Sequence, residues 1–146
     1  ANEYQRIMRK DASDIVLNDE QTKHSDETLS VIRLVPDGGS ILDLPEDFYS
    51  IRNYKNTFKR MNSKTQSITI DCGHRNYFHY KENRVPSVRE SARLQSFPDA
   101  YFFTGSKTSQ YTQVGNAVPP LLAYEVAKQI IRTYEEVQNV SIQRTV

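Results

Sequence analysis

A chain of 146 residues is long enough for one ordinary domain, or for a domain and part of another. Hydrophobic residues make up 37% of it and tryptophan is absent, so the core is lean and we expect part of the apolar surface to need a partner. The single cysteine, Cys72, excludes a disulfide within the chain and favours a reducing compartment. No apolar run is long enough to span a membrane, and no signal peptide is visible.

The net charge of +1 hides an uneven distribution of charge along the chain. Residues 1–47 hold five basic and eleven acidic side chains, whereas residues 48–93 hold ten basic and three acidic ones. Tyr and Phe are interleaved with the basic residues of this middle section, which is the pattern expected of a surface that faces phosphates. A solvated surface on which charges simply cluster is the alternative interpretation.

The N-terminal section contains one clear helix signal. Residues 4–10 form either a short helical turn or a disordered tail, and residues 15–17 are compatible with a short strand. Ser25 is a helix N-cap followed by two acidic residues, which the helix dipole favours in a first turn. A proline and two glycines at positions 36–39 end this helix. Its apolar stripe comprises Leu29, Ile32 and Val35.

Two weaker segments follow. Residues 41–49 form a loop or short turn, and its most buried part is expected to be the dipeptide Leu44–Pro45. Residues 52–60 (RNYKNTFKR) are basic and aromatic, which favours a segment that touches a nucleic acid backbone. The candidate phosphate contacts in this segment are Lys55, Lys59 and Arg60.

A hairpin-like pattern comes next. Residues Ser67–Ile70 alternate polar and apolar, which predicts a strand with Ile68 and Ile70 facing the core. Residues 73–76 then form a turn, and residues 77–80 form a return strand.

The stretch from Arg84 to Pro120 is predicted to hold two short helices and the entry to a third. Ser87 and Glu90 make a capping box, so a helix begins at Val88. Phe97–Pro98 ends that helix, because the residue before a proline avoids the helical conformation. Pro119–Pro120 opens the last helix. Its predicted apolar stripe comprises Leu122, Val126, Ile130, Tyr134 and Val137.

Two strings in this stretch, RESARLQSFPDAYFF and SQYTQVGNAVPP, resemble the last two motifs of the DNA (cytosine-5) methyltransferases. In that family the first motif reads roughly R-x-x-x-x-R-E-x-A-R-L-Q-x-F-P, and the second reads G-N-A-V-P. The residues that match are Arg84, Arg89, Glu90, Ala92, Arg93, Leu94, Gln95, Phe97 and Pro98, and then Gly115, Asn116, Ala117, Val118 and Pro119. An unrelated α/β domain with two such helices would explain the helices but not the strings.

The resemblance implies roles for individual residues. Arg84, Arg89, Glu90 and Arg93 would form a buried or half-buried polar network that supports the recognition domain, and charges in such a place must be paired. The segment Gly115–Asn116–Ala117 would border the pocket of S-adenosylmethionine. The alternative for Asn116 is a helix C-terminal cap, and both roles can hold at once.

The resemblance also implies a DNA-facing segment. Thr69, followed by Ile70, occupies the place of a family threonine that lies close to DNA near the flipped cytosine. A solvent-facing strand threonine is the alternative. Arg75, in the predicted turn, is a further candidate for DNA contact.

The residues that perform the family reaction are absent from this sequence. The reaction needs a thiolate in a Pro-Cys dipeptide, a glutamate in a Glu-Asn-Val string and a glycine-rich loop for S-adenosylmethionine. Cys72 lies between Asp71 and Gly73, so we interpret it as a structural or incidental thiol, and we assign no catalytic residue. The histidines and carboxylates show no metal-ligand spacing.

The sequence therefore predicts an α+β chain that corresponds to the C-terminal third of such an enzyme. Residues 1–83 would form the target recognition region, and residues 84–146 would return to a missing Rossmann-like catalytic domain. The chain would bind double-stranded DNA, pair with the N-terminal catalytic half, complete the S-adenosylmethionine site, and act in the bacterial cytoplasm. Alone it would be inactive, whether it is an excised piece or a natural subunit. The alternatives are a stand-alone DNA-binding or regulatory protein, and an inert folding unit.

Overall fold

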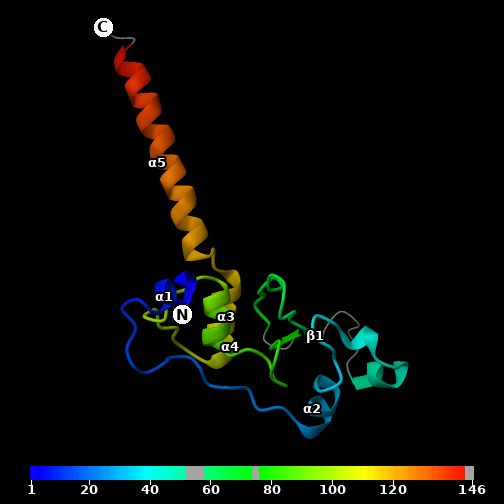
Figure 1. The fold of residues 1–146 in the computed structure, drawn as a ribbon. Coiled ribbons are helices and arrows are strands. Elements are labelled where there is room, and N and C mark those ends of the chain that lie inside the picture. The colour runs from blue at the N-terminus through cyan, green and yellow to red at the C-terminus, as the bar shows by residue number, and fades with distance from the viewer. Residues whose placement is uncertain (52–57, 74–75, 144–146) are drawn as a thin grey trace.

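The computed structural model describes residues 1–51, 58–73 and 76–143 of the chain. Its elements, in chain order, are α1 (Glu3–Arg9), α2 (Asp26–Ile32), the 3-10 turns η1 (Ile41–Asp43) and η2 (Glu46–Ile51), β1 (Lys59–Arg60), β2 (Tyr77–Phe78), α3 (Val88–Leu94), α4 (Lys107–Asn116) and α5 (Pro120–Gln143). Helices with one small sheet make this an α+β fold, as the sequence predicts. In Figure 1, α1, α3 and α4 lie together, α2 and β1 lie apart from them, and α5 projects away from both groups.

Residues 4–10 were expected to form either a short helical turn or a disordered tail. They form a helix, because Asn2 and Gln5 make a capping box at its N-terminus. The predicted strand at residues 15–17 is wrong. Ile15 is 73% exposed there, and Asn18 turns the chain with a positive φ of 61°, so no extended, covered segment can form.

The next section confirms the start of the predicted helix, which ends at Ile32 and so leaves Val35 outside it, and corrects the loop after it. Ser25 caps α2 as expected, and both Ile32 and Val35 are buried. The buried anchor of residues 41–49 is Ile41 rather than Leu44–Pro45, because the capping box of η1 turns Ile41 into the core. Leu44 packs against that core and is half-buried, whereas the proline is exposed.

The sheet differs from the predicted hairpin. Its two strands are parallel, with Lys59 opposite Tyr77 and Arg60 opposite Phe78. Residues 67–70 form no strand and have no strand partner among the described residues, so that predicted strand is wrong, although Ile68 and Ile70 do face the core. Alternation of side chains reports which face is buried, but it does not identify the hydrogen-bonding partner.

Two hydrophobic clusters meet at this sheet. The first contains Met61, Ile70, Tyr77, Val88, Ala92, Phe97, Phe103, Tyr111 and Val114. The second contains Val31, Ile32, Val35, Ile41, Phe58, Phe78 and Val85. Successive residues of a strand point to opposite faces, so Tyr77 enters the first cluster and Phe78 enters the second. The short sheet is therefore the joint between the two clusters.

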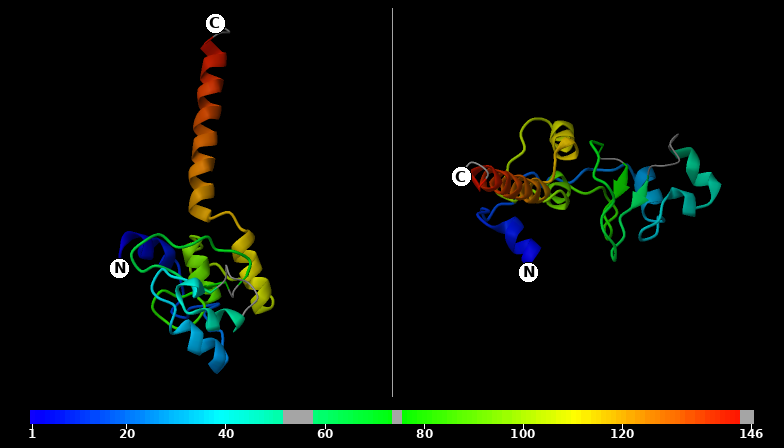
Figure 2. Two further views of the ribbon diagram at one scale, coloured as in Figure 1. Left: turned by 90° about the vertical axis from the view of Figure 1, so that its right-hand side faces the viewer. Right: turned by 90° about the horizontal axis from the view of Figure 1, so that it is seen from above.

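Among the described residues, the C-terminal helix is attached to the rest of the chain near its beginning. It begins at Pro120, as the double proline predicts, and the backbone N–H of Leu121 donates to Ser96 Oγ at 3.1 Å. Beyond that point its predicted apolar stripe is uncovered. The exposed fractions are 56% for Leu122, 50% for Val126, 64% for Ile130, 64% for Tyr134 and 58% for Val137. Figure 2 shows α5 standing clear of the rest of the molecule.

Candidate functional site

The stretch before and within α3 is organised by a bidentate ion pair. Arg84 donates to both carboxylate oxygens of Glu90 at 2.6 and 2.8 Å, and its Nε donates to Glu82 at 2.6 Å. Glu90 also accepts from the backbone N–H of Ser87, which closes the capping box. One carboxylate therefore starts the helix and neutralises the arginine that precedes it.

Arg89, which precedes Glu90 in α3, is completely buried. Its guanidinium donates to the backbone oxygens of Leu17 at 2.9 Å and Pro98 at 3.0 Å, and also to Tyr101. These three acceptors come from segments before and after the helix. The side chain therefore ties the N-terminal section and the loop that follows α3 to one helix.

Arg93, one turn further along, makes a second bidentate pair with Asp99. The two distances are 2.8 and 2.7 Å, and the aspartate side chain is almost fully buried. The backbone N–H of Asp99 donates to the carbonyl of Met8 at 2.7 Å, which joins α1 to the same network. The four residues predicted as structural support thus lie around α3, where Arg84, Glu90 and Arg93 are in ion pairs and Arg89 is held by backbone carbonyls.

The pairing shifts the ionisation of both carboxylates in the same direction. Hydrogen bonds from Arg93 hold the pKa of Asp99 below its ordinary value. Burial by itself raises the pKa of Glu90, but the hydrogen bonds from Arg84 and from the Ser87 backbone outweigh burial and lower it. Both shifts favour the charged carboxylate, as a network of paired charges requires.

The predicted phosphate contact of Arg60 is corrected by its environment. The side chain is 6% exposed, and its Nε and Nη2 donate to the carbonyls of Val35 at 2.8 Å and Ile32 at 2.6 Å. Its Nη1 donates to the carbonyls of His79 and Glu82 at 2.9 and 3.1 Å. A guanidinium that is committed to so many internal acceptors cannot turn out to a phosphate without breaking them.

The remaining predicted DNA contacts are of two kinds. Lys59 and Thr69 are both exposed, as a contact residue must be. Lys55 and Arg75 lie outside the residues that the structure describes. Of the other basic side chains of residues 48–93 that the structure describes, the arginines are engaged within the fold. The exposed lysines are Lys59, Lys64 and Lys81, so the basic surface is narrower than the sequence suggests.

The segment Gly115–Asn116–Ala117 lies where α4 ends. Asn116 is the last residue of the helix and is exposed, and Ala117 is its C-cap. Asn116 Oδ1 accepts a hydrogen bond from Cys72 Sγ at 2.8 Å. Gly115 packs against the backbone of residues 71–72 so closely that a Cβ would lie 2.4 Å from the carbonyl carbon of Asp71.

Two residues that join these parts were not singled out from the sequence. Asn18 donates to the carbonyl of Phe103 at 2.9 Å, accepts from its N–H at 3.0 Å, and offers its own carbonyl to the N–H of Arg89 at 2.9 Å. Its only local signal is that asparagine tolerates a positive φ. Asp99 follows Phe97–Pro98 directly, and a carboxylate six residues after Arg93 was the available hint.

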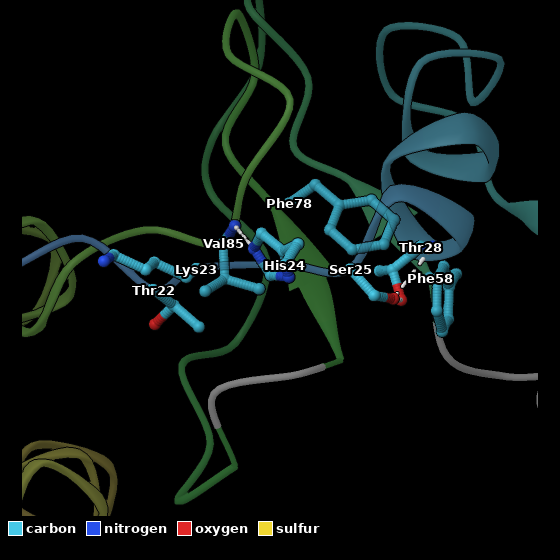
Figure 3. Close-up of a pocket in the computed structure, with 8 residues that line it drawn as sticks. All are labelled: Thr22, Lys23, His24, Ser25, Thr28, Phe58, Phe78 and Val85. Atoms are coloured by element: carbon cyan, nitrogen blue, oxygen red, sulfur yellow. Dashed lines mark hydrogen bonds between the residues drawn. The ribbon is translucent and has the colours of Figure 1, made fainter.

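One pocket is unrelated to the predicted site residues. It has a volume of about 200 Å³ and is lined by Thr22, Lys23, His24, Ser25, Thr28, Phe58, Phe78 and Val85. His24 Nε2 accepts from the backbone N–H of Val85 at 3.2 Å, as Figure 3 shows, and Phe58 meets Phe78 edge to face at 5.0 Å. The pocket therefore lies at the second hydrophobic cluster and belongs to the packing of α2 on the sheet.

Within the described residues, no group of three His, Cys, Asp or Glu side chains is placed to hold a metal ion. Over the same ranges, no helix combines the length and the apolarity needed to cross a bilayer.

Comparison with known proteins gives a family and several relatives. The family model of the C-5 cytosine-specific DNA methylases matches residues 3–132. The Type II methyltransferase M1.HphI of Haemophilus parahaemolyticus is 41% identical over 118 residues, which cover 81% of this chain and 32% of that protein. M.NgoFVII of Neisseria gonorrhoeae is 39% identical over 124 residues, which cover 82% of this chain and 33% of that protein. The chain thus spans about a third of the length of these two relatives.

A third relative has a different extent. The Type II methyltransferase M.AquIB of Picosynechococcus sp. is 39% identical over 127 residues, and the match covers 79% of this chain and 87% of that protein. It is therefore itself a short chain. With a family model that spans most of the sequence and a relative matched over nearly its whole length, this chain belongs to the C-5 cytosine-specific DNA methylase family.

Proposed function

We propose that this chain is the C-terminal, DNA-reading part of a cytosine-5 methyltransferase, which docks on a catalytic half through α5 and closes the S-adenosylmethionine site with the end of α4. The observation that carries the proposal is the uncovered apolar face of α5. The match to about a third of M1.HphI supports it, because the catalytic motifs absent from this sequence would lie in the unmatched part.

The face of α5 has the character of half an interface. Five large apolar side chains that recur along one side of the helix are each at least 50% exposed. The polar residues Glu125, Lys128 and Arg132 lie on the other side. A helix with so broad an apolar face is normally covered, and a contiguous exposed patch of this kind marks an interaction site.

The residues at the end of α4 fit the edge of a cofactor site. Asn116 is exposed, and its amide can present a donor beyond the Cys72 contact that its oxygen already makes. Gly115 and Ala117 beside it are half-buried, and their side chains are too small to block the approach of the cofactor. S-adenosylmethionine would supply the methyl group, and this chain would supply one wall of its site.

The DNA-facing side would combine a phosphate contact with a residue near the target base. Lys59 is exposed on β1, and Thr69 is exposed beside the buried Ile70. Lysine supplies salt-dependent, sequence-independent affinity, whereas loops that reach base edges supply choice of sequence. The proposed recognition region is residues 1–83, and the return to the catalytic domain is residues 84–146.

The short relative supports the existence of chains of this extent that work with a partner. M.AquIB carries the name of a Type II methyltransferase, yet this chain covers 87% of it. On the proposed function, a chain of this extent would receive the catalytic motifs from a partner. This chain is therefore best tested as one component of a mixture.

The test is complementation. The chain is mixed with the part of M1.HphI that it does not match, and transfer of labelled methyl groups from S-adenosylmethionine to duplex DNA is measured. We expect transfer only in the mixture. Ile130→Glu on the apolar face should abolish it, whereas Gln129→Glu, the matched control on the polar side of the same helix, should not.

The opposite results are equally specific. Methyl transfer by the chain alone would overturn the proposal, as would a mixture with no activity in which the two components demonstrably associate. Tight, sequence-specific DNA binding by the chain alone, without complementation, would support a stand-alone DNA-binding protein instead. Shift assays at two salt concentrations give this second readout.

A further inference from the structure

A direct contact between two backbones joins the end of α4 to the segment that contains Thr69. Gly115 lies next to the last residue of α4, and a Cβ on it would lie 2.5 Å from the Asp71 carbonyl oxygen and 2.5 Å from the Cys72 nitrogen. Backbone atoms cannot swing aside as a side chain can. Glycine is therefore needed at position 115 for space.

A second link lies immediately beside the first. The thiol of Cys72 donates to Asn116 Oδ1 at 2.8 Å. Two consecutive residues of one segment, 71 and 72, thus hold two consecutive residues of the other, 115 and 116. The sequence separation is 44 residues for the hydrogen bond, so this is a tertiary clamp and not a local turn.

The recognition side of the clamp is braced. Asp71 accepts from the N–H of Gly73 at 2.8 Å and from the side-chain amide of Asn76 at 2.7 Å. The carbonyl of Asn76 in turn accepts from the N–H of Lys59 at 3.2 Å. On the other side of Asp71, Ile70 packs in the same cluster as residues of α4. A displacement at Gly115 is therefore carried to both proposed DNA contacts, Lys59 and Thr69.

We propose that Gly115 and Cys72 are positioning residues that couple DNA recognition to the cofactor site. They set the distance between the DNA-facing segment and the edge of the cofactor site formed by Asn116. DNA and S-adenosylmethionine should therefore each bind more tightly when the other is bound. This inference rests on the proposed function of the chain. It adds a mechanical connection between two sites that the proposed function leaves separate.

The size of the effect follows from the geometry. Ordinary van der Waals contact begins near 3.4 Å, so a Cβ at 2.4 Å from the Asp71 backbone would push the two segments about 1 Å further apart. A misplacement of about 1 Å, caused by a mutation far from the reacting atoms, can lower the rate about 100-fold. Coupling between two binding sites is commonly about 5- to 150-fold in affinity, and it is reciprocal.

The experiment measures coupling, which a purely structural role would not change selectively. The chain is combined with the catalytic half, and the Kd for a duplex that the mixture methylates is measured with and without S-adenosylhomocysteine, which cannot methylate the DNA. We expect binding at least about 5-fold tighter with the ligand in the wild-type mixture. Gly115→Ala should bring this ratio close to one.

Two further variants keep the test valid if Gly115→Ala folds poorly. Cys72→Ala removes only the hydrogen bond from an exposed thiol and should lower the ratio, whereas Cys72→Ser, which keeps a donor, should restore it. Thr108→Ala, exposed on the same helix, should leave the ratio unchanged. Two results would overturn the coupling but not the proposed function. The first is a wild-type mixture that methylates DNA but shows a ratio near one. The second is a ratio that neither Gly115→Ala nor Cys72→Ala changes. A mixture that never methylates counts against the proposed function instead.

Discussion

Helices α3 and α5 depart from the usual distribution of residues in opposite ways. The first buries an arginine completely, and the second leaves Ile130 64% exposed. Charged residues are seldom buried unless they are paired, and large apolar residues are seldom exposed in contiguous patches. In α3 the exception is resolved inside the chain, because Arg89, Glu90 and Arg93 all have partners. In α5 no described residue covers the exposed apolar side chains.

The difference separates what stabilises this chain from what connects it to another. The α3 network closes on itself and should govern the free energy of unfolding of the isolated chain. The face of α5 contributes little to that free energy and should govern association. Substitutions can test this division, because each region predicts a change in one measurement and not in the other.

Among substitutions of the buried arginines, the largest loss of stability is expected for Arg89→Met. It removes the donors to three part-buried backbone carbonyls, which come from segments on both sides of the helix. We expect a loss of about 4 kcal/mol in the free energy of unfolding, measured by urea denaturation. A loss under about 1 kcal/mol would break the claim that α3 is the organising element.

A smaller but clear loss is expected for Arg60→Met, about 3 kcal/mol, because its carbonyl acceptors lose their donors. The neighbouring variant Lys59→Met is the matched control. It should leave stability unchanged but reduce the slope of log K against log salt for DNA binding by about one. An equal loss of stability in both variants would contradict the assignment of one residue to the fold and the other to DNA.

Acid should destabilise the chain through the Arg93–Asp99 pair. The pKa of Asp99 is lowered in the folded state, so the pair contributes fully above the ordinary carboxyl value of 3.8. That contribution is lost as the pH falls through the lower, folded-state pKa. Asp99→Asn should cost about 1 kcal/mol at neutral pH and should flatten the acid limb of stability against pH. Thermal unfolding between neutral pH and strong acid measures both effects, and Glu90 remains in both proteins as an internal reference.

The smallest effect on stability is expected for Ile130→Glu in α5. The side chain is exposed, so the free energy of unfolding should change by less than about 0.5 kcal/mol. The same change in the buried Val114 of α4 should unfold the chain. Thermal unfolding of the two variants, followed by circular dichroism, compares their stabilities. Destabilisation by Ile130→Glu as large as that by Val114→Glu would show that α5 is covered within the chain.

Local chemistry made the helices predictable. The caps at Ser25 and Ser87 and the proline pair before α5 each act over three or four residues, and each helix begins where expected. The two-residue strands were not predictable, because their pairing joins segments far apart in the chain. Alternation correctly assigned Ile68 and Ile70 to the core and wrongly implied a ladder there.

The roles of basic residues were only partly readable. Lys59 and Arg60 are adjacent and of the same charge, yet one is exposed and the other is 6% exposed. Strand geometry sends neighbours to opposite faces, but the sequence did not reveal which face would be internal. The charge count of residues 48–93 therefore overestimated the surface available to phosphates.

The parallel pairing of β1 with β2 brings the two ends of residues 61–76 to the same place. The part from Asn62 to Ser67 contains no helix or strand, and its residues are exposed or half-buried. Ser63 is tied to Asp37 by two hydrogen bonds, but exchanges at the exposed positions 64–67 would leave both anchors where they are. Such a stretch can diversify quickly between relatives while the frame around it stays constant, and it is the natural position for grafting a new sequence preference.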